Sequence, residues 1–134
     1  MKRSLTIITA LLLGAAFAFA QKSFGNAGFD ATVYDFGRIN TRDGAVQCTF
    51  TVTNNGSEAL NIFAVTTSCS CTSANWTRKE IAPGESGTID VTYTNDEGPY
   101  PFDKTLNVYL SCVDRPVVLH VKGTSYTGKK KRCK

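Results

Sequence analysis

The feature that most constrains this chain is a two-residue alternation of apolar and polar side chains. In the clearest run, residues 45–53, the apolar phase is taken by Val46, Cys48, Phe50 and Val52. A period of two is typical of a half-buried β-strand, because successive side chains of a strand point to opposite faces. Comparable runs follow at residues 60–65, 88–94, 105–110 and 117–121, and a first strand is predicted near residues 31–39.

Turn-forming residues separate these runs. Asparagine, glycine or proline occurs in each of the segments 54–57, 82–85 and 96–99, and these residues adopt or impose turn geometry. The run at residues 60–65 is apolar on both faces, which predicts a central or bent strand. The sequence therefore predicts an all-β fold, an immunoglobulin-like β-sandwich of about seven strands, with a barrel of similar size as the alternative.

The first twenty residues have the pattern of an export signal. Lys2 and Arg3 precede an apolar stretch at residues 5–14, and Ala18 and Ala20 form a small-x-small cleavage site. The apolar stretch is short for a membrane span, which needs about 20 residues. We therefore expect residues 1–20 to be a signal peptide and the mature chain to be periplasmic or secreted, without a transmembrane segment, in a compartment where cysteines can pair.

The chain has 134 residues and a formal net charge of +4, which is enough for one domain. Five of its fifteen basic residues lie in the last six positions, whereas residues 21–128 contain eight basic and eleven acidic residues. The basic character thus belongs to the tail, and no nucleic-acid partner is expected. We predict a flexible segment at residues 21–28, a sandwich domain at 29–126 and a basic disordered tail at 127–134.

Five motifs in this order resemble those of a known family. They are Tyr-Asp-Phe-Gly-Arg-Ile at 34–39, Phe-Thr-Val-Thr-Asn-Asn-Gly at 50–56, Thr-Ser-Cys-Ser-Cys-Thr at 67–72, Ile-Ala-Pro-Gly-Glu-Ser-Gly at 81–87 and Pro-Phe-Asp-Lys-Thr at 101–105. Over residues 29–124 the chain is similar to the domain-of-unknown-function 1573 family of exported bacterial proteins, common in Bacteroidota. The resemblance implies an immunoglobulin-like fold, like that of major-sperm-protein and cilia-associated modules, and no established activity. Ser70 stands where the family commonly has glycine, which puts in question any role that needs an unusual backbone angle there.

The sharpest chemical feature is Cys69-Ser70-Cys71. Two thiols one residue apart can chelate a soft ion such as Cu(I) or Zn²⁺, or can form a small disulfide that is readily reduced. They can also be structural, as buried apolar side chains or as partners of another cysteine. The sequence leaves these three interpretations open, and we expect no cofactor.

Strand position limits which cysteines can pair. Cys48 lies near the start of its predicted strand and Cys112 at the end of another, an offset of about 20 Å that a disulfide cannot bridge. The disulfide candidates are therefore Cys48, Cys69 and Cys71, which we expect at one pole of the sandwich, with Cys112 at the opposite pole. Five cysteines leave at least one unpaired, and Cys133 in the tail is a further partner within reach.

Catalytic signatures are lacking in the sequence. His120 falls in the outward phase of its strand, and no Cys/His or Ser/His/Asp spacing stands out. We therefore predict a non-enzymatic binding or scaffolding module of the bacterial cell envelope that holds an envelope protein or glycan, with Trp76 and Phe102 as candidate surface residues and edge-strand addition as the mode. The alternative is a thiol-redox or metal-binding protein centred on Cys69-Ser70-Cys71.

Overall fold

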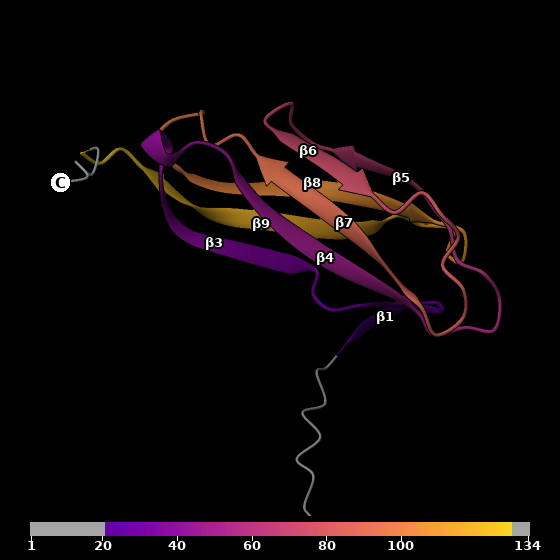
Figure 1. Ribbon diagram of the computed structural model, residues 1–134. Helices are drawn as coiled ribbons and strands as arrows, with labels where there is room; N and C mark the ends of the chain where they lie inside the picture. Colours follow the sequence, from indigo (N-terminus) through magenta and orange to yellow (C-terminus); the bar gives the residue numbers. More distant parts are fainter. Residues whose placement is uncertain (1–20, 130–134) are drawn as a thin grey trace, which may run out of the picture.

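Two β-sheets pack face to face in this protein, in a computed structural model that describes residues 21–129 (Figure 1). The first sheet has the strand order β1 (Lys22–Phe24), β2 (Ala27–Phe29), β4 (Val46–Asn54), β7 (Ser86–Tyr93) and β6 (Thr72–Trp76). The second has the order β3 (Val33–Asn40), β9 (Val117–Tyr126), β8 (Pro101–Leu110) and β5 (Ile62–Thr67). Within residues 21–129 the only helix is the 3₁₀ turn η1 (Thr41–Asp43), and none is long and apolar enough to cross a membrane.

The predicted all-β, immunoglobulin-like sandwich is confirmed, with nine strands within residues 21–129 instead of about seven. Its core lies between the sheets and is filled by the apolar phase of each strand, including Phe50, Ile89, Leu106 and Leu119. The polar phase of β4 and β7 faces outward, as the alternation predicts.

The structure differs from the prediction at the N-terminal side of the domain. Residues 21–28, expected to be flexible, form β1 and most of β2, joined by a tight turn at Gly25 with φ 58°. Ala27 and Phe29 are fully buried, so β2 contributes to the core and extends the sheet beside β4. The predicted signal peptide at 1–20 and residues 130–134 of the predicted tail, with Cys133, lie outside the described residues.

The run at residues 60–65 is an edge strand that bends, not a central one. The pairing of β5 with β8 shifts register between Ile62 and Ala64, which is a β-bulge. The bulge buries both Ile62 and Val65 and leaves Phe63 66% exposed. The apolar residues on both faces of this run therefore reflect the bulge.

A buried asparagine closes each end of the sandwich. Asn95 has φ 58°, and its amide donates to the carbonyls of Asn40 and Gly44 while Ser125 donates to its oxygen. At the other end, Asn54 donates to the carbonyls of Glu58 and Ile81. These bonds satisfy loop carbonyls that would otherwise be buried unpaired, and the first of them fixes the loop that carries Glu97.

Candidate functional site

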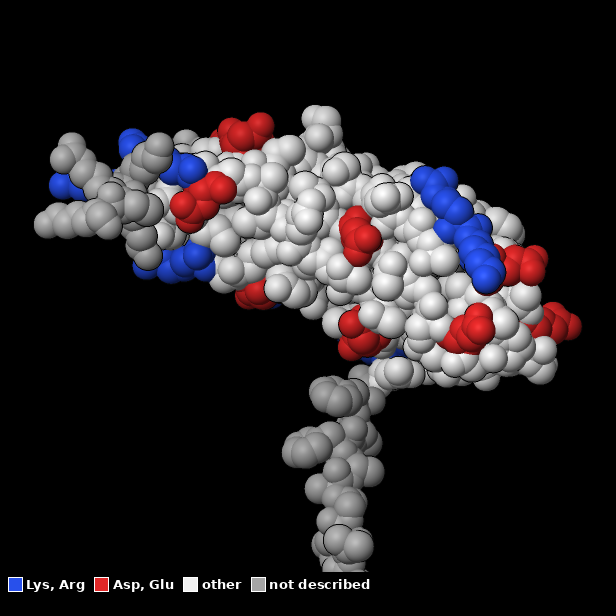
Figure 2. All heavy atoms as spheres, viewed as in Figure 1, with Lys and Arg blue, Asp and Glu red and all other residues white. Residues whose placement is uncertain are grey.

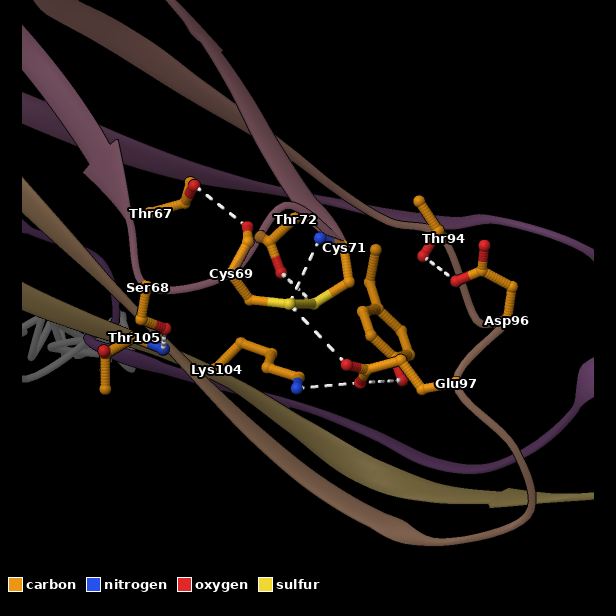
Figure 3. Close-up of a disulfide and its surroundings, with 11 residues drawn as sticks. Thr67, Ser68, Cys69, Cys71, Thr72, Thr94, Asp96, Glu97, Lys104 and Thr105 are labelled. Atoms are coloured by element: carbon orange, nitrogen blue, oxygen red, sulfur yellow. Dashed lines mark hydrogen bonds and ion pairs between the residues drawn. A yellow bond between two sulfur atoms is a disulfide. The ribbon is translucent and has the colours of Figure 1, made fainter.

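Cys69 and Cys71 form a disulfide where the chain crosses from the second sheet to the first (Figure 3). Cys69 follows the end of β5, and Cys71 precedes the first residue of β6. Their Cα atoms are 5.2 Å apart. Cys71 is buried and Cys69 half-buried, so Cys69 is the more accessible half of the disulfide.

Hydrogen-bond donors face both sulfur atoms. The Cys71 amide donates to Cys69 Sγ at 3.1 Å, and the Thr72 hydroxyl lies 3.6 Å from Cys71 Sγ, to which it donates because the disulfide sulfur carries no hydrogen. The Cys69 carbonyl accepts from the Thr72 amide and the Thr67 hydroxyl. These bonds hold the loop in place and put one hydrogen-bond donor on each sulfur atom.

A carboxylate completes this cluster. Glu97 Oε1 lies 3.6 Å from Cys69 Sγ, whereas Glu97 Oε2 accepts from Lys104 Nζ at 2.7 Å and from the Tyr93 hydroxyl at 3.2 Å. The hydrogen bond from Lys104 lowers the pKa of Glu97, so the carboxylate is ionised at neutral pH. Burial, together with the bond to Glu97, raises the pKa of Tyr93.

The three potential ligand atoms are close together. Cys69 Sγ, Cys71 Sγ and a Glu97 carboxylate oxygen all lie within 4.8 Å of one another. In the disulfide form the cluster can undergo thiol–disulfide exchange, and in the dithiol form it presents two sulfur ligands and one oxygen ligand. The sequence spacing identifies the two cysteines but not Glu97, which is far away in sequence and belongs to residues 96–99, predicted only as a turn.

Ser70 does not need the conformation that favours glycine. Among residues 21–129, Asn95 alone of the non-glycine residues has a positive φ. The serine in place of the commonly seen glycine is therefore compatible with this disulfide loop.

Cys48 does not join this cluster. It is a free, buried thiol in the main core, whereas Cys71 packs in a separate cluster with Tyr93 and Phe102. Cys48 lies on β4, and β7 separates β4 from β6, a gap of about 10 Å that exceeds the Cα separation of a disulfide. Burial, and secondarily the charge of Asp90, raises the pKa of Cys48 to about 11.

Cys112 lies at the opposite end of the sandwich. It is a free thiol that, with Asn26, Asn54 and Glu58, lines a small hollow. Asn54 is the last residue of β4, six positions beyond Cys48. The strand offset therefore separates Cys48 from Cys112, as the sequence indicates.

Neither aromatic candidate forms an open contact surface. Phe102 is buried and stacks on Tyr93, with ring centroids 4.1 Å apart. Trp76 packs against the main core, and the Arg78 guanidinium covers its indole ring at 3.7 Å from the centroid. Both residues therefore serve packing near the candidate sites.

The edge strand β6 is a second candidate site. In the described part of the chain, β6 pairs with β7 alone. The Thr94 amide donates to the Cys71 carbonyl, and the Thr77 amide donates to the Thr88 carbonyl. In an antiparallel pair every second residue bonds to the neighbouring strand, so residues 71, 73, 75 and 77 face β7. The backbone N–H and C=O groups of Ala74 and Trp76 therefore point away from β7. A hollow of about 350 Å³ on the outer face of β4, β7 and β6 reaches this edge and is lined by polar side chains, among them Gln47, Ser73, Asn75 and Asp90.

The family follows from the sequence over this same region. A family model described as "Protein of unknown function (DUF1573)" matches residues 27–125. The chain belongs to the DUF1573 family. The match includes the disulfide loop, Glu97 and the whole of β6. Among curated proteins, none matches the chain in sequence.

Solved structures share the fold of this DUF1573 domain. A protein of unknown function from Porphyromonas gingivalis W83 has 23% identity and a TM-score of 0.64, covering 81% of this chain and 50% of its own. The PapD-like domain 7 of human CEP192 has 6% identity and a TM-score of 0.65, covering 78% of this chain and 88% of its own. The Vibrio cholerae VesB protease has 21% identity and a TM-score of 0.58, covering 74% of this chain and 32% of its own.

These similarities are to the sandwich alone. The chain spans half the length of the Porphyromonas protein and about a third of VesB, and likenesses with identities below a quarter show the fold alone. This DUF1573 protein is therefore a two-sheet domain of unknown function, and its role has to be argued from its own residues.

Proposed function

We propose that this DUF1573 protein is an exported, non-enzymatic binding module of the bacterial envelope. It holds a partner protein by adding an extended segment of that partner to β6. The observation that carries the proposal is the direction of the backbone N–H and C=O groups of Ala74 and Trp76, which point away from β7. Exposed backbone donors and acceptors on an edge strand are a template for pairing with another chain.

The other three edges carry features that discourage such pairing. β1 has only three residues. β3 shifts register between Asp35 and Arg38, and β5 shifts between Ile62 and Ala64; bulges of this kind twist an edge away from an incoming strand. β6, by contrast, pairs without a break over five residues, none of them charged.

The surface beside β6 suits an uncharged or weakly polar strand. The outward phase of β6 and β7 consists of hydroxyl and carboxamide side chains with Asp90 as an acidic exception. Figure 2 shows that charged side chains are sparse over the middle of the face that carries β4, β7 and β6. Side chains of an added strand would lie next to the hollow lined by Ser73 and Asn75 and find hydrogen-bond partners there.

The Cys69–Cys71 disulfide supports an exported role. A disulfide fits an oxidising compartment, in agreement with the signal-like residues 1–20.

The surroundings of His120 support a non-enzymatic role. Its Nδ1 lies 2.9 Å from Asp103 Oδ1 on the outer face of the second sheet, a pair that could activate a nucleophile. Within residues 21–129 no serine, threonine or cysteine hydrogen-bonds to that imidazole, so the pair lacks an activated nucleophile.

In-cell photo-crosslinking tests the binding mode. A photoreactive amino acid is placed at Asn75 beside the edge, or at Lys122 on the other sheet as a control, and the envelope is analysed for adducts. The blocking variant is Ala74→Pro, which removes the outward N–H, and its matched control is Ala74→Ser, which keeps it. The proposal predicts a defined protein adduct from Asn75 that falls at least tenfold in Ala74→Pro and persists in Ala74→Ser.

Several outcomes would overturn the proposal. An adduct that survives Ala74→Pro would exclude strand addition, and an adduct found only from Lys122 would place the binding surface on the other sheet. A carbohydrate adduct in place of a protein would assign a glycan partner. Export is tested separately by fractionation and N-terminal sequencing, which should find a chain beginning at Gln21 outside the cytoplasm; a cytoplasmic chain that retains residues 1–20 would contradict it.

A further inference from the structure

We propose that the dithiol form of Cys69 and Cys71, together with Glu97, is a Zn²⁺ site that the Cys69–Cys71 disulfide closes. Two thiolates and one carboxylate oxygen would bind the ion and leave its fourth position to water. This inference does not depend on strand addition at β6.

The positions of the three ligand atoms carry the inference. They already lie within 4.8 Å of one another. Two sulfur atoms bound tetrahedrally at about 2.3 Å from zinc are about 3.8 Å apart, a separation that cysteine Cα atoms 5.2 Å apart can accommodate by rotation of the side chains. The ligand cluster can thus form without moving the strands.

Each ligand also has a group that orients it. The Cys71 amide donates to Cys69 Sγ, and the Thr72 hydroxyl to Cys71 Sγ. Lys104 and Tyr93 both bind Glu97 Oε2, which leaves Oε1 facing Cys69 Sγ at 3.6 Å. Hydrogen bonds from outer groups are what holds and tunes the ligands of known metal sites.

Glu97 Oε1 and Cys69 Sγ face each other with lone pairs, and in the dithiol form a positive charge or a hydrogen is required between them. In the disulfide neither atom carries a hydrogen, so this contact is not a hydrogen bond. After reduction a proton or a cation can lie between the two atoms. A cation bound by both thiolates and by Oε1 satisfies all three ligands at once.

The ligand types select zinc. Two thiolates alone suit Cu(I) as well as Zn²⁺, but an oxygen ligand is poorly matched to Cu(I) and is common in zinc sites. Hard cations such as Ca²⁺ and Mg²⁺ require oxygen ligands and are excluded by the two sulfur atoms. Two thiolates and a carboxylate, with one position open, therefore assign Zn²⁺.

The redox step requires a dithiol reductant. An external protein or small-molecule dithiol transfers two electrons and two protons to the Cys69–Cys71 disulfide, which breaks the S–S bond, and is itself oxidised to a disulfide. Zn²⁺ then displaces the two thiol protons. In the reverse exchange, an external disulfide accepts two electrons from the thiolates and two protons from solvent and becomes a dithiol, while the Cys69–Cys71 bond re-forms and Zn²⁺ is released.

Zinc titration of the purified chain tests this site. All samples carry Cys112→Ser and Cys133→Ser. One half is kept as the disulfide, and the other half is reduced with a dithiol that is then removed. Both forms are titrated with Zn²⁺ against a competing chromogenic chelator. Cobalt is titrated in parallel, because thiolate ligands produce a charge-transfer absorption. The reduced protein should bind one Zn²⁺ and give this absorption, and the disulfide form should bind at least 100-fold more weakly.

Variants identify the ligands. Cys69→Ser and Cys71→Ser should each weaken Zn²⁺ binding about 100-fold, and Glu97→Gln at least tenfold, whereas Asp96→Asn, the matched control on the same loop, should leave it unchanged. Far-ultraviolet circular dichroism verifies that each variant is folded. Equal zinc affinity of Glu97→Gln and wild type, tight zinc binding by the disulfide form, or a preference for Cu(I) that ignores Glu97 would each overturn the assignment.

Discussion

Glu97 Oε1 lies 3.6 Å from the Cys69 sulfur, although the two residues are 28 positions apart in sequence. The contact joins two loops, one that crosses between the sheets and one that connects β7 to β8. Because the Asn95 side chain fixes the second loop and the disulfide fixes the first, the carboxylate and the sulfur atoms meet in a defined geometry.

The Cys69–Cys71 disulfide should contribute little to stability. In the chain-entropy description, closing a loop of three residues is worth about 1.6 kcal/mol, compared with about 3 kcal/mol for a loop of fifteen. We therefore expect Cys69→Ser/Cys71→Ser to lower the free energy of unfolding by about 1.5 kcal/mol or less, as measured by urea denaturation. Cys112→Ser is the control for a thiol change elsewhere. A loss above about 3 kcal/mol would show that the disulfide is a structural staple.

The alternation of side chains was sufficient to predict the central strands. β4, observed at Val46–Asn54, matches the run predicted at residues 45–53, β8 and β9 contain the runs predicted for them, and β7 ends at Tyr93, one residue before the end of its predicted run 88–94. The hairpin β1–β2 was missed because each strand has only three residues and two glycines interrupt the pattern. β6 was missed because its inward residues, Thr72, Ala74 and Trp76, include only one large apolar side chain.

The candidate site was predictable only where its residues are adjacent in sequence. Cys69 and Cys71 identify themselves by spacing, and the offset between Cys48 and Cys112 follows from strand length. Glu97 lies in the β7–β8 connection and contacts Cys69 Sγ, and Lys104 lies on β8 and bonds to Glu97; nothing in their local sequence indicates either contact. Cys48 does lie toward the disulfide end of β4, opposite Val91, but strand direction alone does not predict the strand order that places β7 between β4 and β6 and keeps Cys48 from pairing with Cys69 or Cys71.

Asn95 should be among the most sensitive polar positions. It is 1% exposed, and its side chain bonds to Asn40, Gly44 and Ser125. Asn95→Ala leaves these groups unpaired in the interior and should cost about 3 kcal/mol of unfolding free energy. Asn95→Gly should cost less, because glycine adopts φ 58° without a Cβ penalty. Equal losses in chemical denaturation would mean that the backbone angle contributes nothing.

Cys48 should be inert in the native protein and should make stability fall at high pH. Its pKa is raised from 9.0 to about 11 by burial, so the folded state keeps the thiol proton where the unfolded state loses it. The contribution of Cys48 to the free energy of unfolding is therefore fully present below pH 9. It is lost as the pH rises from 9 to 11, which lowers that free energy by about 1–3 kcal/mol.

Two measurements examine Cys48. Iodoacetamide at pH 8 should alkylate the half-buried Cys112 in the native protein, and Cys48 only after denaturation. The fall in unfolding free energy between pH 9 and 11 should be smaller in Cys48→Ala than in wild type, since other groups titrate equally in both. Rapid native alkylation of Cys48, or identical pH slopes, would contradict its burial as a protonated thiol.

Proline substitutions along β6 should give an asymmetric result. The ladder phase directs the Ser73 N–H toward Thr92 on β7 and the Ala74 N–H away from the sheet. Ser73→Pro removes a ladder bond and leaves a carbonyl of β7 unpaired, which should cost about 2–4 kcal/mol. Ala74→Pro removes an N–H that bonds to no strand within residues 21–129. Prolines are tolerated at such positions of an edge strand, so its cost should be less than half that of Ser73→Pro. Thermal denaturation of the two variants measures the difference. The outward direction of the Ala74 N–H is also what makes it available to an incoming strand. Equal destabilisation by the two prolines would show that this N–H is already bonded. That result would remove the structural basis for strand addition at β6.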